Sequence, residues 1–359
     1  MRPLGLPQLQ GCLCGGAMGD ALGAPVKFLA YPVIVTTYGE HGITKLPSTA
    51  AGSDNSQQMI FVLEGLLRAH LRQQLRGSAD ASAVVHHALM RWLHTQQASP
   101  WSDLLQRVDK SGWLLQQQPL FERRTPGLTS IAALEQSQYF GDLARNHSKG
   151  CGALTRAAPF AFFPMPWQLA FQSARHTHGH PTAAFASAFF AHLLAQLWQN
   201  DISLHQAVLR TLAYAVHQQS QSSLDNPIGN DVLVLVKRVL QFVQQEYAPT
   251  PSRIHDFAEG WVAEEALAVG LWCALFADDF ASGISLAVNH SGNSDACGMV
   301  CGNLLGLLFS EQALSPDWLT PLTLAPILKR LSDDFYQQVH QDQGDLRRRQ
   351  QLLLHYPAW

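Results

Sequence analysis

The chain carries little charge, and neither sign is in marked excess. Only 14% of its 359 residues are charged, with 24 basic and 27 acidic side chains and a net charge of −3. About a quarter of the residues are charged in an average soluble protein. Without a basic surplus the sequence has no electrostatic footprint for nucleic acid, so we expect no nucleic-acid partner. The one dense basic run, at 347–349, is interpreted as a solvated helix end.

The sequence also lacks a long uninterrupted apolar segment. The longest apolar stretch, at 160–171, is broken by Pro164 and Pro166, whereas a membrane-spanning helix needs roughly 20 apolar residues in a row. No targeting segment stands out near the start, because Pro3 and Pro7 interrupt the apolar residues there. We therefore expect no membrane association and a cytoplasmic location. The 6 cysteines lack zinc-ribbon spacing and are expected to be free thiols.

Patterns typical of strands are scarce. Apolar residues recur at three- and four-residue steps through 59–75 and 322–339, which predicts amphipathic helices. The nearest approach to a strand is a short β-branched run at 31–35. Junctions rich in Gly and Pro separate the helical segments, at 11–25, 39–52, 150–166 and 290–306. This layout predicts an all-α bundle whose loops converge on one cleft.

Polar residues suited to chemistry gather at these junctions. Small residues at three- and four-residue spacing in 15–27 predict a close crossing of two helices. Ser53 and Asp54 precede a helix, where they either cap it or offer oxygen ligands to a hard cation. The segment 150–159 is a glycine-flanked helix start, whose backbone N–H groups suit phosphate. Oxygen-bearing side chains before a helix recur at 291–298.

Together, and in this order, these segments resemble the motifs of the ADP-ribosylglycohydrolase family, of the dinitrogenase-reductase-activating type. That family opens with Gly-Asp-x-x-Gly-x-Pro, with an acidic residue two positions after the proline. It continues with Ser/Thr-Asp-Asp-Thr, a glycine-rich segment and Thr-His, and closes with Gly-Asp-x-Asp-Ser/Thr. The corresponding segments here are 19–25, 53–56, 150–159, 177–178 and 292–296. The resemblance covers about residues 8–310.

The resemblance implies a single domain over 1–359, folded as one orthogonal all-α bundle, with 311–359 as a C-terminal helical extension. It also implies a cleft in which members of the family hold two magnesium ions, which orient ADP-ribose and a water for hydrolysis. The diphosphate would lie on Gly150, Cys151, Gly152 and Ala153. His178 would lie near the same ligand.

The chain departs from the family pattern at the metal-ligand positions. An acidic residue is replaced by lysine, two aspartates by asparagine and a hydroxyl residue by alanine, at Lys27, Asn55, Asn293 and Ala296. The oxygen ligands that remain are Ser53, Asp54 and Asp295. Five carboxylates facing two divalent ions are thereby reduced to two carboxylates and one lysine, with roughly one net negative charge. We expect Lys27 to pair with Asp54 or Asp295, and we expect no metal cofactor; weak magnesium binding is the alternative.

These features predict a family member that binds rather than hydrolyses. Its partner would be ADP-ribose, an ADP-ribosylated protein or another protein surface, in a regulatory or immunity role. One alternative is an active hydrolase that uses one metal or none, with Asp54 or Asp295 as general base. The other is a structural protein that keeps only the fold. Calorimetry with ADP-ribose, with and without magnesium, separates the three.

Overall fold

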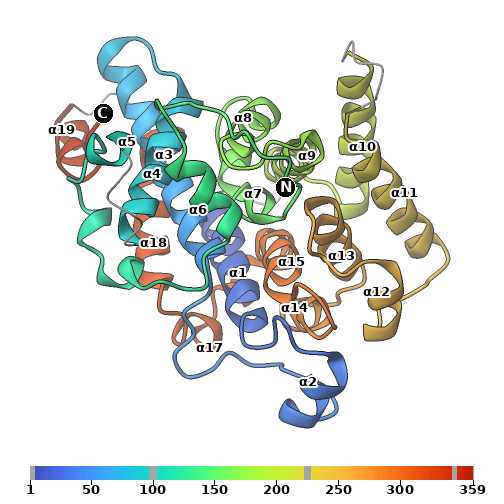
Figure 1. The fold of residues 1–359 in the computed structure, drawn as a ribbon. Coiled ribbons are helices and arrows are strands. Elements are labelled where there is room, and N and C mark those ends of the chain that lie inside the picture. Colours follow the sequence, from blue (N-terminus) through green and yellow to red (C-terminus); the bar gives the residue numbers. More distant parts are fainter. Residues whose placement is uncertain (1–4, 97–102, 222–227, 342–345, 359) are drawn as a thin grey trace.

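The computed structural model describes residues 5–96, 103–221, 228–341 and 346–358. Within these ranges the chain is helical and forms no strand, as the sequence predicts (Figure 1). The α-helices are Leu6–Gly23 (α1), Tyr31–Tyr38 (α2), Asp54–Arg76 (α3), Ala81–Thr95 (α4), Asp103–Gln106 (α5), Leu128–Glu135 (α6), Gly152–Thr155 (α7), Pro166–Ala174 (α8), Pro181–Gln199 (α9), Leu204–Ser220 (α10), Asn230–Gln244 (α11), Pro251–Phe257 (α12), Ala263–Leu275 (α13), Phe280–Val288 (α14), Ser294–Leu308 (α15), Ser310–Ala313 (α16), Pro316–Leu319 (α17), Ala325–His340 (α18) and Leu346–His355 (α19). Short 3-10 helices form at Leu114–Gln116 (η1), Gln118–Phe121 (η2) and Ala158–Phe162 (η3).

Helices α1 and α15 cross at the centre of the molecule with their backbones in contact (Figure 1). A Cβ atom on Gly19 would lie 1.9 Å from the carbonyl oxygen of Gly298, and one on Gly306 would lie 2.0 Å from that of Gly11. Glycine at these positions is therefore required for the close approach. The two helices run antiparallel, so the end of α1 meets the start of α15. The close crossing predicted from the small residues at 15–27 is confirmed.

The remaining helices enclose this pair. Helix α3 packs against α4 and α18, and the buried Arg91 of α4 makes two hydrogen bonds to Glu64 of α3, at 2.9 and 3.1 Å. In Figure 1, α10, α11 and α12 lie on the side of the molecule opposite α18 and α19. No helix in the described part of the chain combines the length and apolar character needed to cross a membrane.

The β-branched run at 31–35, the nearest approach to a strand in the sequence, forms a helix. Pro32 lies in the first turn of α2, where its fixed φ suits a helix and its missing N–H is not needed. The hydroxyls of Thr36 and Thr37 donate to carbonyls four residues earlier, at 2.8 Å each. Only Ile34 of α2 is buried. In the described ranges no strand is available to pair with this run, so helical hydrogen bonds satisfy its backbone instead.

The C-terminal end docks on the body of the protein rather than extending from it. Tyr356 is buried, and its hydroxyl donates to Asp334 of α18 at 2.8 Å. Arg68 of α3 donates to the carbonyl of Pro357 at 2.7 Å. Trp359, the last residue of this aromatic end, lies outside the described residues.

Candidate functional site

The starts of three helices meet the end of α1 at one place. Ser53 is the N-cap of α3, Cys151 the N-cap of α7 and Asn293 the N-cap of α15. Lys27 follows α1 by one turn, and the antiparallel crossing with α15 brings it to the start of that helix. Helix starts carry unpaired N–H groups and a partial positive charge, so this junction favours negatively charged groups.

Lys27 forms an ion pair with Asp295, one of the two partners that the sequence allows. The Lys27 ammonium lies 2.9 Å from Oδ2 of Asp295, and the two side chains are 17% and 0% exposed. Burial raises the pKa of Asp295, against the opposing effect of the lysine. Burial acts to lower the pKa of Lys27, but attraction to Asp295 outweighs it and the net shift is upward. Lys27 is therefore positively charged at neutral pH, and it neutralises the carboxylate of Asp295.

Asp20, to which the sequence assigns no role, organises the start of α3. This fully buried carboxylate accepts hydrogen bonds from the hydroxyl and N–H of Ser53, at 2.6 and 2.8 Å, and from the hydroxyl of Ser56. It also accepts a longer bond, of 3.4 Å, from the Asn55 amide. The sequence feature that could have indicated this role is the position of Asp20 in an apolar, glycine-rich helical segment. A carboxylate buried in such a segment needs several hydrogen-bond donors.

Asn55 links two parts of the site. Its Oδ1 accepts a 2.9 Å hydrogen bond from Thr155 of α7, while its Nδ2 faces Asp20. An aspartate at this position would place a second carboxylate against Asp20 and could not donate to it. The amide therefore fits a site in which no cation separates these two side chains.

Asp54 is fixed from two sides. Its Oδ2 accepts hydrogen bonds from Gln58 at 2.7 Å and from the Gly127 N–H at 3.1 Å. Gln58 in turn accepts a 2.9 Å bond from Arg156, which lies in the same buried layer. Burial raises the pKa of Asp54 to about 7, opposed by the Gly127 hydrogen bond. At neutral pH this carboxyl group is therefore close to its titration midpoint.

Asn293 and Cys151 join the glycine segment to α15. The Asn293 amide donates to the Cys151 sulfur at 2.9 Å. Burial raises the pKa of the Cys151 thiol to about 12, so the sulfur stays protonated at neutral pH. Two buried oxygens nearby, Oδ1 of Asn293 and Oδ1 of Asp295, have no hydrogen-bond partner among the residues that the structure describes. Unpaired buried acceptors are costly, and they suit a ligand or water that offers hydroxyl donors.

His178 packs on the glycine segment. A Cβ atom on Gly152 would lie 3.3 Å from Cε1 of His178, and one on Gly150 would lie 3.5 Å from Nε2. Nδ1 of His178 is held by the Thr177 hydroxyl at 2.8 Å, and burial lowers the pKa of the imidazole to about 3. The ring is therefore neutral and fixed in orientation. Ala153, the other residue predicted for the diphosphate, is buried.

An exposed aromatic pair, which no pattern in the sequence indicates, lies beside the Lys27–Asp295 ion pair. Phe28 is 74% exposed and has a left-handed backbone with φ of 74°. Its ring stacks on that of Trp261 with centroids 5.5 Å apart, and the Lys27 ammonium lies 5.5 Å from the Phe28 centroid. Trp261 precedes Val262, which forms a bridge with Gly150. The pair therefore joins the Lys27 turn to the glycine segment.

The sequence profile of the ADP-ribosylglycohydrolase family matches residues 6–345. The chain belongs to the ADP-ribosylglycohydrolase family. The fold agrees with a solved structure described as an ADP-ribosylglycohydrolase-related protein complex, with a TM-score of 0.64 and 23% sequence identity. The similarity covers 93% of this chain and 98% of that one. No curated protein sequence matches this chain.

The motif resemblance associates the ADP-ribosylglycohydrolase family with two magnesium ions, and the residues of this member do not fit such a pair. Lys27 holds Asp295, and serine and asparagine donors hold both oxygens of Asp20. Asp54 is held by hydrogen bonds from Gln58 and the Gly127 N–H, both to Oδ2. Ala296 is buried and brings no oxygen to the site. Among the residues that the structure describes, no three His, Cys, Asp or Glu side chains form a metal-binding group.

Proposed function

We propose that this protein binds an ADP-ribosyl group without hydrolysing it, and that Lys27 occupies the place of a cation. The ion pair between Lys27 and Asp295 is the observation that carries the proposal. An ammonium this close to the carboxylate repels a divalent ion by several kcal/mol at the effective dielectric of a partly buried site. The charge of the cleft is then balanced by the protein itself.

The unpaired acceptors of the site support binding of a sugar. Oδ1 of Asn293 and Oδ1 of Asp295 are buried and without partners, and ribose hydroxyls are donors of the required kind. A hydrogen bond between a hydroxyl and a carboxylate is stronger than one between neutral groups. Lys27 and the Asn293 amide would fix the positions of these two oxygens before the ligand arrives.

The glycine segment would hold the diphosphate of the same ligand. Gly150 and Gly152 leave room for the backbone to approach closely, and the neutral His178 ring lies against them. Lys149, directly before this segment, is paired with Glu264 and Asp231, which anchors the segment to α13 and α11. Ligands of this proposed site are free ADP-ribose or an ADP-ribosylated protein in the cytoplasm, where the protein would act as a regulator or immunity factor.

Calorimetry of the full-length protein with ADP-ribose, in magnesium and in a chelator, tests the proposal. We expect equal affinity in both conditions and no ADP-ribose released from a modified protein. An Asp295→Asn variant should bind more weakly, while Asp317→Asn, which alters an exposed aspartate of α17, should bind as the parent does. Magnesium-dependent release of ADP-ribose would refute the proposal. If ADP-ribose does not bind in either condition, the result would refute the proposal and favour a structural protein that keeps only the fold.

A hydrolase that works without metal is the second candidate, and Asp54 favours it. A general base is most effective when its pKa lies near the working pH, and burial raises the pKa of Asp54 to about 7. Hydrogen bonds from Gln58 and Gly127 to Oδ2 hold the carboxyl group in place. This candidate requires release of ADP-ribose in chelator, with a rate that Asp54→Asn reduces by 100-fold or more, in line with roughly 10²–10⁴-fold for general-base catalysis.

A further inference from the structure

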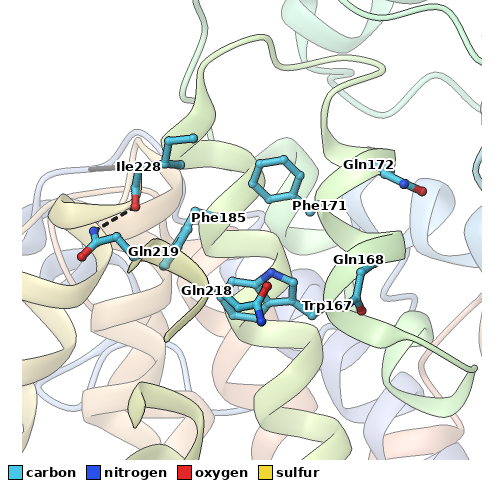
Figure 2. A pocket seen from close by; sticks show the side chains of 8 residues that line it. All are labelled: Trp167, Gln168, Phe171, Gln172, Phe185, Gln218, Gln219 and Ile228. Carbon is cyan, nitrogen blue, oxygen red and sulfur yellow. Dashed lines mark hydrogen bonds between the residues drawn. The ribbon is translucent and has the colours of Figure 1, made fainter. Parts of the chain in front are cut away.

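A cavity lies between α8, α9 and α10, apart from the Lys27–Asp295 site. Its volume is about 260 Å³. We call it the aromatic–glutamine pocket: three aromatic rings line it, those of Trp167, Phe171 and Phe185, together with Ile228. The remaining lining residues are glutamines, Gln168 and Gln172 of α8 and Gln218 and Gln219 near the end of α10. Figure 2 shows Gln168 and Gln172 on one side of the pocket and Gln219 with Ile228 on the other.

Two rings of the aromatic wall, those of Trp167 and Phe185, pack against each other. Trp167 is 5% exposed and makes edge contacts with Phe185 at 5.1 Å and with Tyr214 at 5.3 Å. On the side of the pocket opposite Gln168 and Gln172, the Gln219 amide donates to the carbonyl of Ile228 at 2.9 Å, as Figure 2 shows. Rings and rim held in this way lose little conformational entropy when a ligand binds.

The lining specifies the chemistry of the occupant. Aromatic faces favour a planar ring, which they contact by stacking or edge-on. Glutamine amides both donate and accept hydrogen bonds, so they suit a ring whose edge carries both kinds of group. Among the described residues that line the pocket none is charged, and against these residues a charged ligand would lose its hydration without compensation. The volume lies below the roughly 300–1,000 Å³ of pockets for drug-sized ligands, which indicates a one- or two-ring molecule.

The geometry points to a binding site for a neutral, planar nitrogen heterocycle of purine size in the aromatic–glutamine pocket. The pocket shares no residue with the Lys27–Asp295 site. It is nevertheless connected to the glycine segment, because Phe171 packs against the buried cluster that contains Ala153. The heterocycle is either a separate purine nucleoside or the base of a nucleotide whose other end lies in the cleft.

Calorimetry of the full-length protein with adenosine tests this inference. We expect saturable one-site binding that Phe171→Ala weakens by at least about fivefold, as for the loss of one aromatic–base stacking contact. Ile228→Trp should abolish it by filling the pocket. Gln218→Ala should weaken binding, whereas Gln241→Ala, at an exposed glutamine of α11, should not. Gln218 is only half-buried, so its variant remains informative if replacement of Phe171 impairs folding.

Competition identifies the source of the heterocycle. If ADP-ribose displaces adenosine, the pocket holds the base of the ligand in the cleft; if both bind together, it holds a separate nucleoside. Both results support the site. Adenosine binding that survives Ile228→Trp and Gln218→Ala would overturn the inference, and so would the absence of adenosine binding. Adenosine binding by a protein that does not bind ADP-ribose would leave this site standing while the proposed function fails, so the two failures are distinguishable.

Discussion

Replacing Lys27 by methionine removes the one side chain, among the described residues, that pairs with the buried carboxylate of Asp295. Oδ1 of Asp295 already lacks a partner and Oδ2 would lose its 2.9 Å bond, which leaves the N–H of Ala296 as the remaining donor. Breaking a buried ion pair from one side costs about 3–5 kcal/mol. Because Lys27 is 17% exposed, we expect the lower end, about 3 kcal/mol of unfolding free energy at pH 8.

The loss should depend on pH in a defined direction. Without the lysine the folded-state pKa of Asp295, which burial already raises, rises further above its unfolded value. The folded variant then retains a proton that the unfolded chain releases, so its stability falls as pH rises through this window. We therefore expect a small difference from the parent at pH 5 and a large one at pH 8.

Urea denaturation followed by circular dichroism at both pH values measures this effect. The double variant Lys27→Met/Asp295→Asn should recover most of the loss, with a coupling free energy of about 2–3 kcal/mol. Lys237→Met, at an exposed lysine of α11, is the matched control and should change stability by less than about 0.5 kcal/mol. The reasoning fails if Lys27→Met matches this control at pH 8, or if Asp295→Asn does not rescue it.

Three further variants probe other parts of the site. Burial raises the pKa of Asp54 from 3.8 to about 7, so the stability of the parent falls as pH rises between those values. In the same urea assay, Asp54→Asn should therefore be more stable than the parent by about 1–3 kcal/mol at pH 8. At pH 4 the variant should show no such gain. Gly19→Ala should lower the thermal midpoint strongly, since overpacking a core costs about 1–3 kcal/mol or more, whereas Gly5→Ala, whose Cβ has no neighbour within 3.5 Å, should not. Restoring the family ligands should produce saturable magnesium binding by calorimetry that the parent lacks, and its absence would show that more than the ligands has changed. The restored positions are Lys27→Glu, Asn55→Asp, Asn293→Asp and Ala296→Thr.

The sequence was sufficient for the helical fold because its apolar periodicity and small-residue spacing act locally. The glycines that bring α1 and α15 into contact are visible in the sequence, and so is the loss of acidic residues that leads to the Lys27–Asp295 pair. The run at 31–35 has residue types favoured in strands yet forms a helix, because β propensity reflects packing against a partner strand.

Other features of the site depend on contacts that no local pattern encodes. The five donors around Asp20 come from the start of α3 and its N-cap, more than thirty residues away. The stacking of Phe28 on Trp261 joins residues from opposite ends of the domain. Their types are unremarkable in isolation, and only the folded chain brings them together.

The crossing of α1 and α15 has a consequence for how this cleft can change. In a metal site the ligands and the ion hold one another in place, so a lost ligand disturbs the rest. Here Lys27 follows α1 and Asp295 lies in the first turn of α15, so the contact between these two backbones brings the pair together. The charged side chains at this junction can therefore be replaced without disturbing the helix crossing. A scaffold of this kind is well suited to acquire new ligands, by descent or by design, because its helix crossing does not depend on a metal ion.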